Sequence, residues 1–486
     1  MVKKGDVLEL RVDSLALGGK GVARTGELVV FVEGAYPGEV VRARVTRRTS
    51  SWAEASLVEL EVGSPDRRTP RCVHFGAVCG GCRSQDLAYA AQVEAKTRQV
   101  AETLARLGGL RDVPVAPCVP SPDVWHYRNK MEFSFHPGEE GSPNLGLHVR
   151  KKFDTIFDLV HCDISTELTN RVVHATRDFA RAAGWAAYHP RLHQGLVRFL
   201  TVRHLQSTGQ AAVHLVAARD AVPDVAQWAE EIGALDPAIR SVALSVNDGR
   251  ANVAFGEATR ILWGAPAIEE RLLGLSFEAS PNAFLQTNSR QAEALYAAAL
   301  EEAALTGSER VLDVYCGAGT ISLALARQAA EVLGIESHEP AVADARRNAE
   351  RNGIANARFA CGEARAVLRA WAHARAGRGA ASPGAARAKD AKAPLDPAAY
   401  VPFAPDVVVL DPPRAGLHPR VVERVAELAP ARVVYVSCNP GTLARDLAHF
   451  GRHGYATTRV RPFDLFPHTP HVECVARLDP VAAPAP

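Results

Sequence analysis

The sequence lacks the features of a membrane-spanning or secreted protein. Its 486 residues contain no run of ~18 apolar residues, and the first segment, MVKKGDVLEL, has no apolar stretch of the kind that a signal peptide needs. The nine cysteines are an odd number, which argues against a disulfide framework and favours metal-binding or catalytic thiols in a reducing compartment. We therefore expect a cytoplasmic protein that does not contact a membrane.

The sequence also lacks a strong net charge. Its 56 Lys and Arg residues nearly balance its 54 Asp and Glu residues, which leaves a net charge of +2. Any nucleic-acid partner must therefore be bound by local basic patches rather than by a global positive field. The chain is too long for one hydrophobic core and predicts about three domains. No obligate protein partner is indicated, and we expect a monomer.

Residues 1–62 have the pattern of a small β-barrel. Short alternating segments such as VLELRV and VVRARVTR are separated by glycines, which predicts several strands joined by turns in an OB-like barrel. Such barrels often bind single-stranded nucleic acid. The four arginines at positions 42, 44, 47 and 48 would give one face a positive stripe. The alternative is a charged edge strand that resists aggregation.

A cysteine cluster follows the predicted barrel. Cys72, Cys79 and Cys82 lie within eleven residues, and Gly80-Gly81 frames the last two in a CxxC hairpin. This spacing is typical of metal ligands, and a distant fourth thiol would complete a four-thiolate site. The spacing alone leaves both zinc and an iron–sulfur cluster open. Cys118 and Cys361 lack such partners, and we expect them to be structural.

The middle of the chain, to about residue 275, predicts an α+β region. Residues 86–107 have helical periodicity, and 125–135 (WHYRNKMEFSF) alternate like a strand in which aromatic residues interleave with Arg128 and Lys130. Such a strand would face RNA through stacking rings and cationic side chains. The alternative is a half-buried strand whose aromatic rings belong to the core.

Beyond residue 276 the pattern becomes a βαβ repeat. The segment RVLDVYCGAGT predicts a strand followed by a glycine turn, and Glu336 ends the next strand, which is the layout of a nucleoside-binding doubly wound sheet. Because no further glycine follows the turn, S-adenosylmethionine fits better than a dinucleotide, with its ribose near Glu336 and its adenine near Glu363. Asp411 and Arg414 in DPPR follow the fourth strand. The acids at these strand ends could instead be helix caps. Residues 371–400, rich in Ala, Gly, Pro and Arg, predict a disordered insertion.

Cys438 lies at the end of the fifth predicted strand, in VVYVSCNPGT. The carboxyl ends of parallel strands are where open α/β sheets carry their chemistry, so this thiol is a candidate nucleophile and an acid on a neighbouring strand a candidate base. The alternative is a small buried apolar residue. Cys316 opens the glycine turn expected beside the cofactor, which leaves Cys438 as the better candidate to face a substrate base.

The motifs DVYCGAGT, GIES, DPPR, VSCNPGT and PHTPHVE, in this order, resemble those of the bacterial RNA (uracil-5-)-methyltransferases, and most of all the 23S rRNA branch. The resemblance covers essentially the whole chain. It implies a multi-domain fold: a TRAM barrel at 1–62, a central α+β domain with an iron–sulfur segment at 63–275, and a Rossmann-like class I methyltransferase domain at 276–486. The barrel and the cysteine segment are expected to be missing from the bacterial tRNA enzyme.

The resemblance also implies site residues. The ligands of a [4Fe–4S] cluster would be Cys72, Cys79, Cys82 and Cys162. The contacts to S-adenosylmethionine would be Gln286, Tyr315, Thr320, Glu336, Glu363 and Asp411. Thr320 stands where asparagine occurs in the family and Glu363 where Asn or Asp is usual, and both still form hydrogen bonds. Glu473 of PHTPHVE would be the proton acceptor, while His468 and His471 are expected to be core or capping residues.

These residues predict a covalent mechanism on C5 of uracil, a poor nucleophile. The Cys438 thiolate would add to C6, C5 would take the methyl group, and Glu473 would remove the C5 proton so that the cysteine leaves. Arg414 would stabilise the thiolate or the enolate. The target base must be flipped out, and Phe284 is placed to stack on it or on a neighbour.

Three alternatives remain at this point. The first is the same chemistry on a tRNA uridine instead of 23S rRNA. The second is a non-catalytic iron–sulfur RNA-binding protein, against which the presence of both Cys438 and Glu473 argues. The third is a DNA methyltransferase, suggested by DPPR and disfavoured by the barrel and the cysteines.

Overall fold

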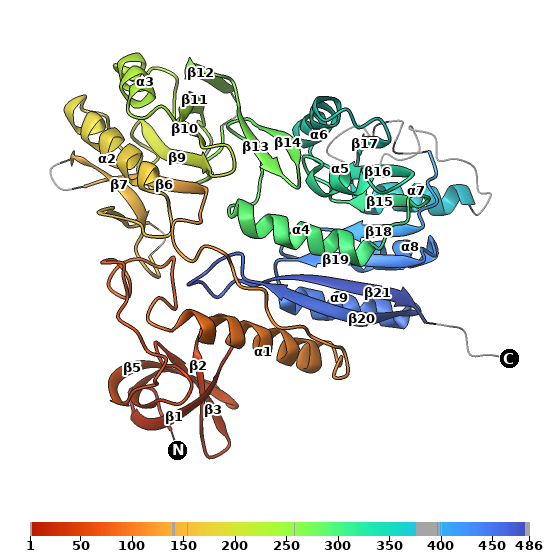
Figure 1. The fold of residues 1–486 in the computed structure, drawn as a ribbon. Coiled ribbons are helices and arrows are strands. Elements are labelled where there is room, and N and C mark those ends of the chain that lie inside the picture. Colours follow the sequence, from red (N-terminus) through yellow and green to blue (C-terminus); the bar gives the residue numbers. More distant parts are fainter. Residues whose placement is uncertain are drawn as a thin grey trace.

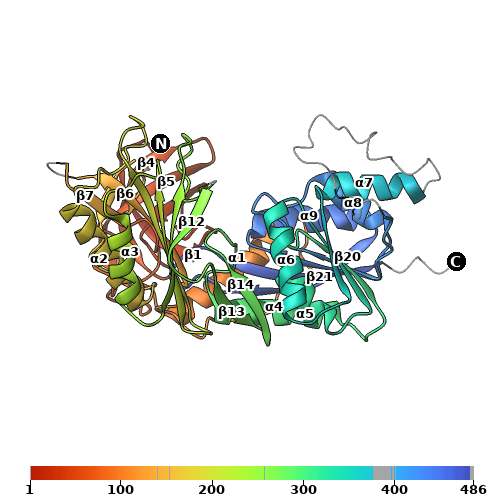
Figure 2. The ribbon, with the colours of Figure 1, turned by 90° about the horizontal axis from the view of Figure 1, so that it is seen from above.

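The computed structural model describes residues 2–481, except 139–140, 153, 257, 376–395, 397–398 and 400. The chain forms a barrel, a central α+β part and a C-terminal α/β part (Figure 1). Seen from above, the two larger sheets lie side by side with the β13–β14 hairpin between them (Figure 2). Within the described residues, no helix has the length and apolar character needed to cross a membrane.

The N-terminal part is a closed barrel, as the alternation of its sequence predicts. Its strand order is β1-β2-β3-β5-β4, and inward-facing residues such as Val30, Val41 and Ala53 are fully buried. The strands are β1 (Val7–Leu15), β2 (Gly21–Thr25), β3 (Leu28–Glu33), β4 (Val40–Arg48) and β5 (Trp52–Val62). Closure pairs every strand on both sides, so no edge is left for aggregation.

The central part is a seven-stranded sheet in the order β12-β11-β10-β9-β6-β7-β8. Its strands are β6 (Lys130–Pro137), β7 (Pro143–His148), β8 (Ile156–Asp158), β9 (Val197–Leu205), β10 (Gln210–Ala217), β11 (Ile239–Val246) and β12 (Ala258–Gly264). Two helices, α2 (Glu167–Ala182) and α3 (Val225–Ala234), pack on it. Helix α1 (Tyr89–Leu107) lies instead between the barrel and the C-terminal part, where it contacts β1 and α9.

The C-terminal sheet has the order β17-β16-β15-β18-β19-β21-β20, in which the first five strands are parallel. Its strands are β15 (Arg310–Val314), β16 (Glu331–Glu336), β17 (Ala357–Cys361), β18 (Val407–Leu410), β19 (Arg432–Ser437), β20 (Tyr455–Phe463) and β21 (Glu473–Pro480). The hairpin of β13 (Ile268–Leu272) and β14 (Leu275–Ala279) leads into it. This order confirms the predicted doubly wound fold.

Helices cover both faces of the C-terminal sheet, which is why its parallel strands are continuous apolar runs. One core contains α4 (Ser289–Ala303), α5 (Thr320–Ala326) and α6 (Glu339–Arg351). The other contains α7 (Ala364–Arg375), α8 (Pro419–Glu427), α9 (Pro440–Arg452) and the inner face of α1. Because these helices cover the two faces, side chains that face away from the cores lie at the ends of the strands.

Two sequence predictions need correction. The strand expected at 125–135 begins only at Lys130, because His126 adopts a left-handed backbone with φ of 55°. Its rings at Tyr127, Phe133 and Phe135 are buried, so they belong to the core and do not face RNA. The predicted insertion does not start at residue 371: Trp371 lies in α7, is fully buried, and donates its ring N–H to the carbonyl of Ala399. Residues 376–395, 397–398 and 400 of that segment lie outside the described residues.

Candidate active site

The parallel strands β15–β19 bring the predicted site residues to one edge of the C-terminal sheet. Tyr315 directly follows β15, Glu336 is the last residue of β16, and Asp411 and Cys438 directly follow β18 and β19. Parallel neighbours end at the same edge, so residues from distant parts of the sequence meet there. Tyr315 has a left-handed backbone with φ of 70°, an unusual state for an aromatic residue that marks the turn as specialised.

The glycine turn after β15 is built around the carboxylate of Glu336. One of its oxygens accepts the backbone N–H of Gly317 at 3.2 Å, and the other accepts those of Ser337 at 2.6 Å and His338 at 2.9 Å. Gly319 begins α5 with φ of 83°, and a Cβ there would lie 3.0 Å from the Phe359 ring. The acid is thereby held in one orientation beside a close-packed turn, as binding of ribose hydroxyls requires.

The other predicted cofactor contacts lie around this turn, in different roles. Thr320 is the first residue of α5 and is half-buried. Glu363 accepts the N–H of Ala366 at 2.9 Å and so caps α7. Helix capping is the alternative that we considered for the acids at the strand ends. Gln286 lies before α4, within hydrogen-bonding reach of Tyr296, and its carbonyl accepts from Asn129 at 3.0 Å.

Cys438 and Glu473 are brought together by the antiparallel pairing of β19 with β21. Ser437 lies opposite Cys474, so the next residues toward the strand end are Cys438 on one strand and Glu473 on the other. The Cys438 thiol is half-buried. Burial, Glu473 and Asp411 raise its pKa to about 11, and Arg414 acts in the opposite direction. The expected preference for the thiolate is therefore absent here, because burial, together with the two nearby acids, outweighs the guanidinium.

The surroundings of three acids at or near this edge raise their pKa values. Glu473 is 5% exposed, and burial together with the Asp411 charge raises its pKa to about 8. Burial, with a smaller contribution from Asp313, raises the pKa of Asp411 to about 7. Asp313, which the sequence did not single out, also has its pKa raised to about 7 by burial, although it accepts a 2.5 Å hydrogen bond from Ser322. Raised carboxyl pKa values near neutrality are typical of general bases.

A cavity of about 1090 Å³ lies beside this edge, between the cysteine segment, the central sheet and the loops at 284–287 and 469–471. Its cationic lining consists of Arg83, Arg128, Lys130, Arg150, Lys151 and Lys152. Phe284, which is 74% exposed, also lines it. Cys438 and Glu473 are not in its wall, but His471, two residues from Glu473, is. The cavity therefore reaches the loop next to Glu473 but contains neither Glu473 nor Cys438.

The histidines of PHTPHVE have different surroundings. His468 is buried and stacks on Trp125 with ring centroids 4.0 Å apart, and burial lowers its pKa to about 4. It is a neutral core residue, as predicted. The residue His471 is exposed, so of the two expected roles, core or capping, the core role is wrong for it. Partial desolvation of its ring and nearby cations, Arg414 first among them, lower its pKa.

The four candidate cluster cysteines line the same cavity. All are free thiols; Cys162 is buried, and the other three are half-buried. Burial raises the pKa of each, and each lies within the electrostatic reach of at least one other. In the part of the chain that the structure describes, no three His, Cys, Asp or Glu side chains converge as ligands of one metal ion. A four-iron cluster binds each thiolate at a separate iron, so its ligands stand further apart.

Sequence reasoning missed a polar cluster beneath Glu473. Lys96 of α1 forms a buried ion pair with Asp464, and Gln92 of the same helix contacts His468. The sequence feature that could have revealed this cluster is the four-residue spacing of Gln92 and Lys96. That spacing places two polar side chains one turn apart on the buried face of the helix.

Comparisons with known proteins match both parts of this architecture. Residues 88–480 match the family described as tRNA (Uracil-5-)-methyltransferase, and residues 2–58 match the TRAM domain. A protein of Halalkalibacterium halodurans named "Uncharacterized RNA methyltransferase" is 36% identical over 478 residues, which are 98% of each chain. One of the same name from Nitratidesulfovibrio vulgaris is 37% identical over 98% of this chain and 96% of its own.

A solved structure is similar over almost the whole chain. The tRNA (uracil-54, C5)-methyltransferase of Pyrococcus abyssi, in complex with S-adenosyl-L-homocysteine, aligns with a TM-score of 0.72 and 30% identity. The alignment covers 97% of this chain and 99% of that one.

Proposed function

The chain belongs to the tRNA (uracil-5-)-methyltransferase family and is an S-adenosylmethionine-dependent RNA methyltransferase with a TRAM domain, and from this we propose that it methylates C5 of one uridine through a covalent adduct on Cys438. The observation that carries the proposal is the pairing of β19 with β21, which puts a thiol and a buried carboxyl at adjacent positions. A thiol alone would allow addition to the ring, but release of the product also needs a base on the same edge.

The chemistry assigns one role to each residue. The Cys438 thiolate bonds to C6 and the ring electrons move to C5 and O4, where Arg414 is the nearby cation. When bound, S-adenosylmethionine would supply the electrophilic methyl group for C5, with cleavage of its sulfonium S–CH3 bond and departure of S-adenosylhomocysteine. Glu473 as carboxylate takes the C5 proton, the C5–C6 double bond re-forms, and the C6–S bond breaks to return the thiolate.

The residues at the strand ends fit the cofactor. Glu336 presents a carboxylate that three backbone N–H groups already orient, and Gly319 lets the turn beside it pack closely against the Phe359 ring. Tyr315, Thr320, Gln286, Glu363 and Asp411 complete the proposed set. The protonated state of Asp411 near neutrality limits repulsion with Glu473, so both acids can share one site.

We assign Cys72, Cys79, Cys82 and Cys162 as ligands of a [4Fe–4S] cluster. Four free thiols that border one cavity are the donor set that such clusters take. They line the cavity whose wall lacks Cys438 and Glu473, and we give them no direct part in the methyl transfer.

For the RNA, 23S rRNA is the proposed substrate on the strength of the motif set, and a tRNA uridine is the second candidate. The similarity to the Pyrococcus abyssi enzyme favours the latter. Six cations around the cavity beside Phe284 provide phosphate contacts and a stacking surface for either RNA.

One experiment separates the two substrates. Purified protein is incubated with methyl-labelled S-adenosylmethionine and either 23S rRNA or tRNA transcripts, and 5-methyluridine is mapped in each. Label at a single uridine of 23S rRNA supports the first proposal, and label in tRNA alone supports the second. Transfer to neither RNA, under conditions in which the protein binds the cofactor, contradicts both.

A further inference from the structure

The segment before Glu473 is the tip of a β-hairpin. β20 and β21 are antiparallel, and Phe463 lies opposite Glu473, so residues 464–472 form the connecting loop. Glu473 is the residue at which this loop re-enters the sheet. Whatever fixes the loop therefore also fixes the backbone that carries the Glu473 carboxyl.

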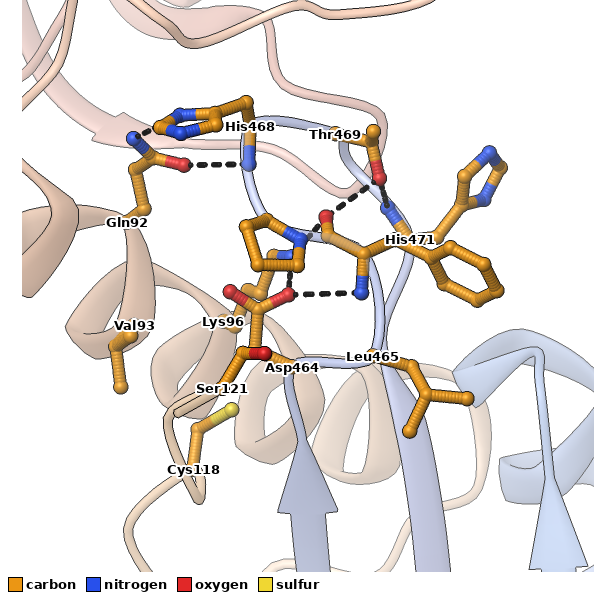
Figure 3. Close-up of polar contacts among 12 residues, drawn as sticks. Gln92, Val93, Lys96, Cys118, Ser121, Asp464, Leu465, His468, Thr469 and His471 are labelled. Carbon is orange, nitrogen blue, oxygen red and sulfur yellow. Dashed lines mark hydrogen bonds and ion pairs between the residues drawn. The ribbon is translucent and has the colours of Figure 1, made fainter. Parts of the chain in front are cut away.

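A buried ion pair holds the beginning of this loop (Figure 3). Nζ of Lys96, on α1, lies 2.5 Å from Oδ1 of Asp464, and the two side chains are 4% and 0% exposed. The same ammonium donates to the carbonyl of Phe466 at 3.2 Å, while Asp464 accepts the Phe466 N–H at 3.2 Å. One side chain from outside the sheet thus fixes the first turn of the loop, and its charge is little screened because water is excluded.

Gln92, one helical turn before Lys96, holds the middle of the same loop. Its carbonyl oxygen accepts the backbone N–H of His468 at 3.0 Å, and its amide lies 3.2 Å from Nδ1 of that ring (Figure 3). His468 has a left-handed backbone with φ of 64°, and its carbonyl accepts the N–H of Arg83 at 2.7 Å. The loop is therefore held by residues outside the methyltransferase domain, and of the two α1 side chains Lys96 is the one that carries a formal charge.

We propose that Lys96 is a positioning residue for the reaction: its ammonium fixes the loop of residues 464–472 through Asp464 and stabilises the ionised form of Glu473. This inference rests on the proposed role of Glu473 as the base. It adds a residue of the central part of the chain to the machinery that releases the product.

The charges around Glu473 show in which direction Lys96 shifts the pKa of this carboxyl. The groups that face Glu473 are Asp411, Cys438, Arg414, Tyr296 and Lys96. Those around Lys96 itself are Asp464, Cys118, His468 and His471, and Tyr89 interacts with Asp464. Burial and Asp411 raise the pKa of Glu473, and Arg414 and Lys96 lower it. Without the ammonium, Glu473 stays protonated to higher pH, and a protonated carboxyl cannot accept the C5 proton.

Two variants that differ only at Lys96 test the proposal. Asp464→Asn keeps the ammonium and an oxygen for the Phe466 N–H. Lys96→Met/Asp464→Asn removes the ion pair as a whole, which avoids leaving an unpaired buried acid and preserves folding better than Lys96→Met alone. The rate at which the covalent protein–RNA adduct decays is measured across pH on denaturing gels, and thermal melting checks that both variants fold.

We expect the double variant to release RNA about tenfold more slowly than Asp464→Asn at neutral pH, with its profile moved to higher pH by about one pH unit. The reason is that, well below the pKa of a carboxyl, a pKa higher by about one leaves about a tenth as much of it ionised. At alkaline pH the two rates converge. Identical profiles for the two variants would overturn the proposal. Arg98→Met is the control, since Arg98 lies on the same helix with its side chain 52% exposed and should retain the wild-type profile.

If Glu473 is not the base, the same measurement of adduct decay gives a different result. If Glu473→Gln releases the adduct as fast as the wild type does, Glu473 is not the base and the proposed function fails. If Glu473→Gln retains the adduct but the two Asp464 variants behave alike, only the role of Lys96 is overturned.

Discussion

Cys438 and Glu473 occupy neighbouring positions on two antiparallel strands, although helix α9 and strand β20 separate them in the chain. The carboxyl raises the pKa of the thiol, so the two groups cannot easily be ionised together. This conflict suits a reaction that uses them in sequence. In the proposed mechanism, the thiolate is needed when the ring is attacked, and the carboxylate is needed only after the methyl group has been transferred.

Replacement of the nucleophile tests the first of these steps. Cys438→Ala should lower methyl transfer by at least about 10³-fold and abolish the covalent protein–RNA band, because the bond between sulfur and C6 can no longer form. Cys474→Ala is the matched control: that thiol is adjacent in the sheet but fully buried, and it should keep both signals. Transfer by Cys438→Ala at the wild-type rate would contradict the covalent mechanism.

Replacement of the base should separate transfer from release. Glu473→Gln keeps the shape and the backbone pairing but cannot take a proton, so methylated RNA should stay bonded to the protein and appear as a stable band on denaturing gels. Glu302→Gln, at another buried acid of this domain, should release its product normally. Free 5-methyluridine RNA formed by Glu473→Gln at the normal rate would show that another group removes the proton.

Affinity for S-adenosylmethionine should depend on Glu336, at the carboxyl end of β16, and not on Glu331, at its amino end. Loss of a charge-assisted hydrogen bond costs about 1.5–3 kcal/mol, so Glu336→Gln should weaken binding of S-adenosylmethionine by roughly 10- to 150-fold in calorimetric titration. Glu331→Gln, at the opposite end of the same strand, should bind normally because its partners are Arg310 and Arg358. Equal affinities for the two variants would remove Glu336 from the site.

Stability without ligands should fall as the pH rises through neutrality. The pKa values of Asp313 and Asp411 are raised from 3.8 to about 7, and that of Glu473 from 4.5 to about 8. Between the lower and the higher values the folded protein binds more protons than the unfolded chain, so the free energy of unfolding decreases with pH in that window. Histidines whose pKa is lowered by burial, such as His214 and His468 at about 4, act in the opposite direction up to about pH 6.5, so the melting temperature should drop mainly between about pH 7 and pH 8. Asp411→Asn should reduce the slope, and an unchanged slope would argue against a raised pKa.

The cysteine assignment predicts a measurable metal content. Protein purified without oxygen should carry about four iron and four sulfide per chain, and Cys82→Ser should lose most of both. Cys361→Ser, at a buried cysteine of β17, should keep them. One zinc per chain and no sulfide would instead identify a single-metal site, the alternative that the spacing left open.

Much of the fold could be read from local patterns. The five strands of the barrel and the βαβ repeat beyond residue 276 follow from alternation, apolar runs and glycine turns, and the sheet order agrees with them. The errors lie where tertiary contacts override a local pattern. The alternating segment at 125–129 is not a strand, and Trp371, in a stretch of low complexity, is buried in the core.

Local sequence features were enough to predict an S-adenosylmethionine-dependent RNA methyltransferase: a thiol at a strand end, a glycine turn followed by an acid, and motifs specific to one family. The folded chain was needed to show that Cys438 lies beside Glu473, that the aromatic rings of 127–135 are buried, and that Lys96 reaches the loop before the base. These relationships depend on strand register and on the packing of distant parts of the chain. Burial then sets the pKa values, because the cost of a charge depends on what surrounds it and not on its neighbours in sequence.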